Sequence, residues 1–197
     1  MQTESNLLDR RWVVKTLLSD RRDLLVVTGL GAPTYDCAAA GDHPGNFYLW
    51  GAMGGGAMVG LGLALAQPDR RVVVITGDGE QLMGLGALAT IGAQGPDNLA
   101  IVVLDNERYG ETGMQRTHTA HGVDLAGIAR ASGFPDARTV RGEDEVHALA
   151  AALRQGRGLL LADVKVSPED LPRVLPSRDG AYIKTRFREH VLGQASA

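Results

Sequence analysis

Two short polar motifs each follow an apolar run, and their side chains are of a kind that binds metal ions. Gly77-Asp78-Gly79 comes directly after the apolar run 71–76, and Asp105-Asn106 comes after the run 98–104. Carboxylate and amide oxygens are hard ligands that suit a magnesium ion. The glycines would let an anion approach the backbone, whereas the Asp78 carboxylate would repel phosphate oxygens unless a cation stood between them. The motifs therefore predict a magnesium site that also holds a diphosphate.

The apolar runs before these motifs are typical of neighbouring strands in a buried parallel sheet. Neither run alternates apolar and polar residues, as expected for strands that are covered on both faces. Between them, residues 80–94 carry apolar side chains at helical spacing and end at Gly95-Pro96, which predicts one helix. The fold class is therefore α/β, a three-layer, doubly wound parallel sheet of about six strands with helices on both faces. Ligands of such sheets bind at the carboxyl ends of the strands.

Further elements are expected on both sides of this unit. The sequence predicts helices over 5–18, 125–132, 143–155 and about 181–192, and strands over 24–28, 137–140 and 158–166. Small residues at helical spacing in 54–62 would let a helix lie close to the sheet or to a ligand. We expect a single domain over 1–197, in which 167–197 is a C-terminal tail and helix that covers an active site or contacts a partner.

Composition and charge exclude several classes of protein. The chain has 197 residues, 44% of them hydrophobic, which suffices for a sizeable core, and a net charge of −3 argues against a nucleic-acid partner. The N-terminus has no signal pattern and no stretch approaches the ~18 apolar residues of a membrane span, so we expect a cytoplasmic protein without a membrane partner. Cys37 is the only cysteine, which excludes an internal disulfide and an iron–sulfur site and predicts a small buried apolar side chain.

With these motifs the chain resembles the thiamine-diphosphate-dependent 2-oxo acid decarboxylases. Asn106 follows Asp78 at a distance of 28 positions, which is similar to the spacing of the cofactor signature in that family. Residues 104–113 resemble the metal-binding loop of sulfopyruvate and phosphonopyruvate decarboxylases, and residues 47–54 resemble the cofactor segment that precedes it. The resemblance covers roughly 24–166 and implies the thiamine-diphosphate-binding fold.

The resemblance implies how this chain would hold the metal and the diphosphate of the cofactor. Asp78, the side chain of Asn106 and the main-chain carbonyl of Arg108 would bind Mg²⁺. Gly79 and Glu80 would hold the diphosphate. Further cofactor contacts would come from the neighbouring residues Gly77, Tyr109 and Gly110.

The resemblance also implies contacts to the two rings of the cofactor. The carbonyl of Gly51 would accept a hydrogen bond from the exocyclic amine of the aminopyrimidine. Met53 would press between the rings and hold the bent form in which that amine lies near the reactive thiazolium carbon, which gives Met53 a catalytic role. The loop 28–34 would lie at the cofactor without an assigned contact.

A partner chain is implied as well. In the family, a glutamate from a pyrimidine-binding domain activates the aminopyrimidine, and residues before the loop 28–34 leave no room for a further domain of ~100 residues. The chain resembles the β subunit of sulfopyruvate decarboxylase, in which two short chains divide the two halves. We therefore expect a hetero-oligomer in which a pyrimidine-binding subunit supplies the activating glutamate, and little catalysis by this chain alone.

Proton donation and substrate binding suggest further candidates. His118 follows the metal loop and could donate a proton near neutral pH, and we favour it over His121, although a polar loop histidine without a catalytic role is an alternative. Arg116 and the basic residues of the tail, Lys184, Arg186 and Arg188, could bind an anionic group of the substrate or could be solvated surface charge.

The leading interpretation is a diphosphate-binding subunit that decarboxylates a small 2-oxo acid, such as sulfopyruvate or phosphonopyruvate, to an aldehyde with thiamine diphosphate and Mg²⁺. Two alternatives stay open. The same cofactor could serve a carboligase subunit similar to acetolactate synthase, or the chain could be a non-catalytic regulatory subunit that binds the cofactor.

Overall fold

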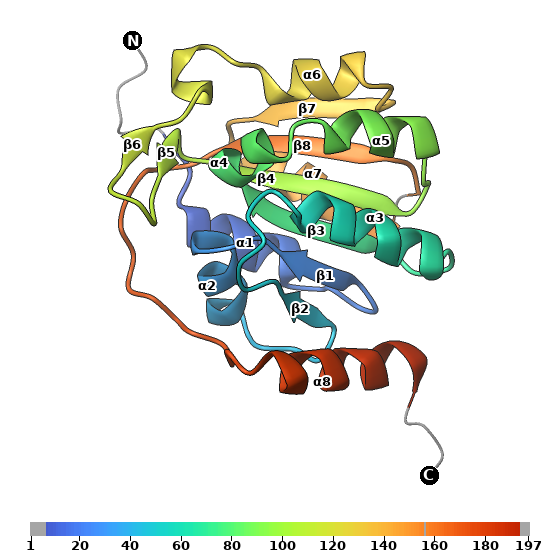
Figure 1. Cartoon of the computed structure of the whole chain (residues 1–197). Coiled ribbons are helices and arrows are strands. Elements are labelled where there is room, and N and C mark those ends of the chain that lie inside the picture. Colours follow the sequence, from blue (N-terminus) through green and yellow to red (C-terminus); the bar gives the residue numbers. More distant parts are fainter. Residues whose placement is uncertain (1–6, 156, 194–197) are drawn as a thin grey trace.

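The structure is a computed structural model that describes residues 7–155 and 157–193. Six parallel strands form one sheet in the order β2-β1-β3-β4-β8-β7 (Figure 1). These strands are β1 (Leu25–Thr28), β2 (Asn46–Tyr48), β3 (Val72–Gly77), β4 (Leu99–Asp105), β7 (Asp136–Val140) and β8 (Leu160–Lys165). A short antiparallel hairpin, β5 (Arg108–Tyr109) with β6 (Gln115–Arg116), follows β4. The predicted α/β fold with about six parallel strands is confirmed.

Helices cover both faces of this sheet. The helices are α1 (Arg10–Leu18), α2 (Ala32–Ala39), α3 (Gly56–Ala66), α4 (Asp78–Met83), α5 (Ala87–Gln94), α6 (Leu125–Ala131), α7 (Glu143–Gln155) and α8 (Gly180–Leu192), with a 3₁₀ turn at Thr119–His121. Among the described residues, no helix is both long and apolar enough to cross a lipid bilayer.

The core is divided into two layers by the sheet itself. Alternate residues of a strand point to opposite faces, so Val73 and Ile75 of β3 pack with α1, α2 and α7, whereas Val72 and Val74 pack with α3, α5 and α6. Every residue of β4 is buried, which explains why that strand is apolar without alternation. Cys37 lies fully buried in the first layer, as predicted.

The single helix expected over 80–94 is wrong, because the chain forms α4 and α5 with a break between them. A side chain at Gly84 would place its Cβ 2.1 Å from the carbonyl oxygen of Gly54. The break therefore brings the end of α4 and the loop before α3 into direct backbone contact. Only glycine permits this approach.

The first helix is also shorter than predicted, although residues 5 and 6 lie outside the described part of the chain. It begins at Arg10, after Asp9 accepts a hydrogen bond from the backbone N–H of Trp12. Leu8 instead forms a parallel bridge with Val166 beyond β8. Helix α2, strand β2 and the β5–β6 hairpin were not predicted from the sequence, because they are short and lack a clear apolar period.

Helix α8 covers the edge strand β2, as Figure 1 shows in red. Phe187 packs edge-to-face on Phe47 with 5.4 Å between ring centroids, and Arg186 forms an ion pair with Asp42 at 2.6 Å. A helix over an exposed strand prevents further pairing at that edge. The segment 166–179 connects β8 to α8 and passes the carboxyl ends of the strands (Figure 1).

His43 lies at this junction among positive charges. Its Nδ1 accepts a hydrogen bond from the backbone N–H of Gly45 at 3.0 Å, and its ring meets that of His190 with 5.2 Å between centroids. Burial, followed by the charges of Arg21, His190 and Arg186, lowers the pKa of His43 to about 4, although Asp42 opposes the shift. Neutral His43 is therefore part of the packing of α8.

We expect the free energy of unfolding to decrease as the pH falls from about 6.5 to about 4, because the unfolded chain takes up a proton at His43 before the folded chain does. His43→Gln should weaken this dependence, and His121→Gln, an exposed position, should not. Urea unfolding at several pH values measures it. If the wild type and His43→Gln lost the same stability between about pH 6.5 and about pH 4, His43 would not be the cause of the pH dependence.

Candidate functional site

A cavity of about 190 Å³ lies at the carboxyl ends of the central strands. Strands β3 and β4 pair in parallel with Gly77 beside Leu104, so the residues that follow the two strands meet at this cavity. It is lined by nine of the ten predicted cofactor-binding residues: Met53, Gly77, Asp78, Gly79, Glu80, Asn106, Arg108, Tyr109 and Gly110. Gly51 is not among the lining residues, and its role stays a prediction.

Asp78 is a buried carboxylate held by two threonines. Its Oδ2 accepts hydrogen bonds from the hydroxyls of Thr117 at 2.5 Å and Thr119 at 3.2 Å. Burial and the neighbouring charge of Asp105 raise the pKa of Asp78, and the two hydroxyls partly oppose this. No ion pair of Asp78 is present within residues 7–155 and 157–193. This carboxylate is therefore oriented and short of positive charge.

A second group of buried charges lies behind Asp78. Asp105 accepts from Thr119 at 2.9 Å and pairs with Nζ of Lys165, whose Nζ also lies 3.5 Å from Asp163. Burial alone would lower the pKa of Lys165, but the Asp163 and Asp105 carboxylates outweigh it and raise that pKa. Burial and the charge of Asp105 raise the pKa of Asp163. The two buried carboxylates Asp105 and Asp163 thus share one lysine, and among the residues that the structure describes Asp78 has no cation of its own.

This excess of negative charge fits a divalent cation at the pocket wall. The described residues contain no group of three or more His, Cys, Asp or Glu side chains arranged for a metal ion, so the predicted ligand set relies on one carboxylate, one amide and one main-chain oxygen. Such a set suits magnesium, which keeps waters and is commonly bound through one or two carboxylates with phosphates of a ligand. The Asn106 Oδ1 also accepts a hydrogen bond from the backbone N–H of Arg108 at 3.0 Å, which fixes the loop that carries both residues.

The two glycines of the first motif serve different purposes. A Cβ at Gly79 would lie 2.6 Å from the ring of Tyr109, so glycine there allows the hairpin to pack on the start of α4. A Cβ at Gly77 would meet nothing within 4 Å. Gly77 therefore leaves space at the pocket wall for a ligand.

The C-terminal tail forms one side of the pocket, and that the tail covers an active site stays a prediction. Residues Pro168, Glu169, Asp170, Leu171 and Arg173 line the cavity. The segment is held by a hydrogen bond from Arg11 to the carbonyl oxygen of Pro172 at 2.7 Å and by one from Trp50 to that of Ser177 at 2.8 Å. Arg173 lies 3.8 Å from Glu111 and over the ring of Tyr35.

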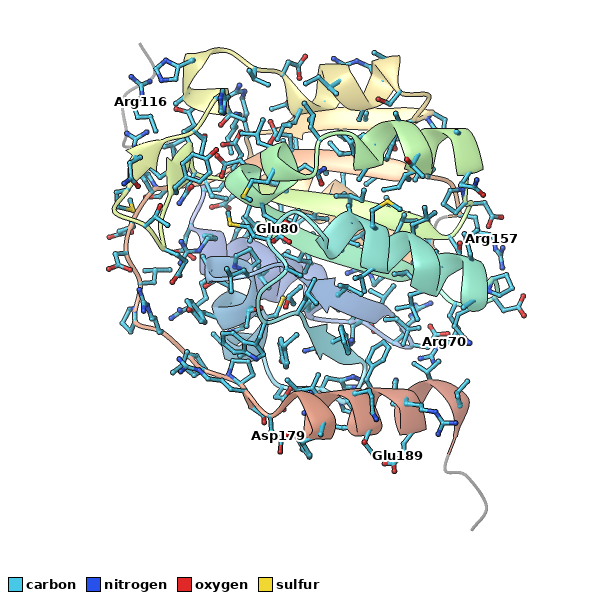
Figure 2. The ribbon with its side chains drawn as sticks, in the orientation of Figure 1. Arg70, Glu80, Arg116, Arg157, Asp179 and Glu189 are labelled. Atoms are coloured by element: carbon cyan, nitrogen blue, oxygen red, sulfur yellow. The ribbon has the colours of Figure 1, made fainter. Side chains whose placement is uncertain are left out.

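The predicted basic residues and histidine are placed elsewhere. His118 is exposed and is not among the residues that line the cavity, and its catalytic role stays a prediction. Arg116 ends β6 opposite Arg108, at the open end of the hairpin, and lies apart from Glu80 (Figure 2). It donates to the carbonyl oxygen of Ala120 at 2.7 Å. None of the tail residues Lys184, Arg186 and Arg188 lines the cavity either.

Sequence reasoning missed Arg10, Tyr35 and Arg173 as lining residues. Arg10 pairs with the buried Asp36 of α2, and Tyr35 belongs to the same helix. Because α2 and the route of the tail were not predicted, no local signal pointed to these residues. Only the three-dimensional arrangement shows them at the pocket.

Comparisons with known proteins agree with this geometry. Residues 32–164 match the family model of the thiamine pyrophosphate enzymes, C-terminal TPP binding domain. The sulfopyruvate decarboxylase subunit beta of Methanothermobacter thermautotrophicus is 38% identical over 95% of this chain and 97% of that protein. The phosphonopyruvate decarboxylase of Streptomyces viridochromogenes is 41% identical over 86% of this chain and 43% of that protein.

A solved structure has the same fold as this chain. A crystal structure from Mycobacterium smegmatis, described as a thiamin diphosphate-dependent enzyme, superposes with a TM-score of 0.70 at 25% identity, over 84% of this chain and 32% of that one. The chain therefore spans less than half the length of this structure and of the phosphonopyruvate decarboxylase, but nearly all of the subunit beta.

Replacing Lys165 tests the buried charge network. Lys165→Met should reduce the free energy of unfolding by about 3 kcal/mol or more, because Asp105 and Asp163 would lose their cationic partner inside the protein. Lys15→Met, at an exposed position of α1, serves as the control and should change stability by less than about 0.5 kcal/mol. Urea unfolding at pH 7 measures both, and equal stability of the two variants would refute the network.

Proposed function

This chain belongs to the thiamine pyrophosphate enzymes through their C-terminal cofactor-binding domain, and we propose that it is the diphosphate-binding subunit of a decarboxylase that acts on a small 2-oxo acid. The observation that carries the proposal is the convergence of Asp78 and Asn106 on one pocket from neighbouring parallel strands. The names of the relatives, sulfopyruvate decarboxylase subunit beta and phosphonopyruvate decarboxylase, support the reaction class.

In this proposal the chain binds magnesium through Asp78, the Asn106 side chain and the main-chain carbonyl of Arg108. Thr117 and Thr119 orient the Asp78 carboxylate for that task. The magnesium ion neutralises the diphosphate, which would otherwise be repelled by the carboxylates. Gly77 leaves room for the diphosphate beside the start of α4.

Bound thiamine diphosphate supplies a carbon nucleophile and an electron sink for the loss of carbon dioxide. The chain's own contribution is to hold that cofactor in a reactive shape. Met53 lines the pocket and is 38% exposed, so its side chain is available to support the cofactor rings. The tail segment from Pro168 to Arg173 forms part of the pocket wall beside the cofactor.

A second polypeptide completes the site. Several relatives are named as subunit beta, which supports a heteromeric assembly for this chain. We place the activating glutamate on a pyrimidine-binding partner, in a hetero-oligomer of the two chains. Alone, the chain would then bind the cofactor weakly and catalyse little.

The substrate is proposed to be a 2-oxo acid with a second anionic group. Both named relatives act on such acids, whose sulfonate or phosphonate oxygens suit a guanidinium partner. Arg173 is the best placed candidate, because it lines the pocket and its side chain is 56% exposed, with one ion pair at 3.8 Å. Arg10, by contrast, is occupied by the buried Asp36.

Asp78→Asn tests the metal and cofactor assignment. The variant keeps the side-chain volume but removes the charge, so Mg²⁺-dependent binding of thiamine diphosphate should weaken at least about 100-fold. Calorimetry on this chain, alone and co-expressed with a pyrimidine-binding partner, measures it, and Asp69→Asn at an exposed turn is the control.

Tight binding by the wild type only in the co-expressed complex would support the divided site. The same complex should then release carbon dioxide from a 2-oxo acid and yield an aldehyde, whereas a ligated hydroxy-oxo acid would identify a carboligase. Absence of binding by the wild type in both samples, or full activity of Asp78→Asn, would refute the proposal.

Arg173→Met tests the recognition of the second anion. We expect the KM for sulfopyruvate or phosphonopyruvate to rise at least about 10-fold, because a charge-assisted hydrogen bond is lost. The KM for pyruvate, which lacks the second anion, should change little. Arg116→Met is the matched control, and an equal effect on all substrates would contradict the role of Arg173.

A further inference from the structure

Glu80 is a buried carboxylate that faces two loops and the end of β3 at the pocket. It belongs to the first turn of α4 and is 4% exposed (Figure 2). No ion pair of Glu80 is present in the described part of the chain. A buried charge without an ionic partner is costly unless hydrogen-bond donors surround it. The donors around the Glu80 carboxylate therefore determine whether it can be charged inside the protein.

The donors come from two separate loops and from the end of β3. The Oε2 of Glu80 accepts from the backbone N–H of Leu30 at 3.1 Å and from the Thr76 hydroxyl at 2.9 Å. The Oε1 accepts from the backbone N–H of Gly56 at 3.3 Å. Leu30 lies in the loop between β1 and α2 and lines the pocket, and Gly56 begins α3 directly after the Met53 loop.

The glycines around this carboxylate indicate that the space is reserved for it. A Cβ at Gly29 would lie 1.7 Å from the Oε2 of Glu80, and one at Gly56 would lie 3.0 Å from the Oε1. Gly29 is not one of the glycines with positive φ. Glycine at position 29 is therefore explained by the Glu80 side chain and not by the backbone.

A carboxylate suits this position better than an amide. Backbone N–H groups converge on both oxygens, so the NH₂ of a glutamine would face a donor at either end. The donors thus stabilise the charged form of Glu80, and the same hydrogen bonds hold the loops at Leu30 and Gly56 in place.

We propose that Glu80 is a positioning residue whose buried carboxylate joins the loops 29–31 and 54–56 and so sets the spacing of the neighbouring lining residues Leu30 and Met53 at the cofactor pocket. This inference rests on the proposed function. It differs from the role that the family resemblance implied, because the Glu80 carboxylate acts on the loops and not on the diphosphate. Two backbone segments far apart in sequence are thereby held by one side chain.

The first experiment compares Glu80→Gln with Glu143→Gln, an exposed glutamate at the start of α7. In the full chain without cofactor, amide hydrogen exchange of Leu30 and Gly56 followed by NMR should become about tenfold faster in Glu80→Gln, as expected for one weakened charge-assisted hydrogen bond. Exchange at these amides should not change in Glu143→Gln.

The second experiment measures thiamine diphosphate in the assembled enzyme with its partner subunit and Mg²⁺. The Kd and the KM for the cofactor should each rise about tenfold in Glu80→Gln, whereas kcat at saturating cofactor should stay within about threefold of the wild type, since Glu80 does not touch the reacting atoms. A loss of kcat without a change in cofactor affinity would overturn the positioning role.

A double-mutant cycle tests the contact directly and does not depend on one variant. Gly29→Ala should weaken cofactor binding on its own, because its methyl group displaces the Glu80 carboxylate. In a Glu80→Ala background the same change should have a clearly smaller effect, since the nearest oxygen is gone and only the Thr76 hydroxyl, 2.8 Å from the added Cβ, remains. Gly180→Ala, where a Cβ meets nothing within 4 Å, is the control. Additive losses from Gly29→Ala and Glu80→Ala would overturn the inference.

The failure of this inference is distinct from the failure of the proposed function. If the wild-type complex binds thiamine diphosphate and the Glu80 variants bind it equally well, the positioning role is refuted and the function stands. If the wild-type complex itself does not bind the cofactor, the function is refuted and the inference falls with it.

Discussion

The parallel pairing of β3 with β4 is the constraint on which the rest of the site depends. In a parallel pair, both strands end at the same edge of the sheet, and the register of Gly77 beside Leu104 brings the next residues of each strand to one pocket. Because the side chains of a strand alternate between faces, a shift by one residue would turn the core residues of β4 to the wrong layer. The packing of the two hydrophobic layers therefore fixes the distance between candidate metal ligands.

Burial of charge is the second organising feature. Asp78, Asp105 and Asp163 lie within the protein with Lys165 as the cation that contacts two of them. Removing such charges from water costs several kcal/mol each, which the fold offsets with hydroxyl and lysine partners. Because Asp78 has no cationic partner among the described residues, a bound cation would relieve the repulsion between these charges.

The sequence allowed the sheet and most of the pocket to be predicted, because both depend on local signals. Long apolar runs identify buried strands, and the polar residues that end them identify the edge where ligands bind. The break between α4 and α5 escaped prediction, since it results from the contact of Gly84 with Gly54, which is distant in sequence. The same applies to Arg173 and to the loops held by Glu80, whose positions depend on the path of the tail and on tertiary hydrogen bonds.

The tail segment 166–179 is anchored at both ends, by β8 at one end and by α8 on the edge of the sheet at the other. A tethered side chain meets its target at an effective concentration that the length of the tether sets, and not at the concentration of free chains. Arg173 is therefore kept at the pocket mouth with little further loss of chain entropy. With the role proposed for Arg173, the docking of α8 would contribute to ligand affinity without touching the ligand, and the edge of the sheet would be thermodynamically linked to the pocket.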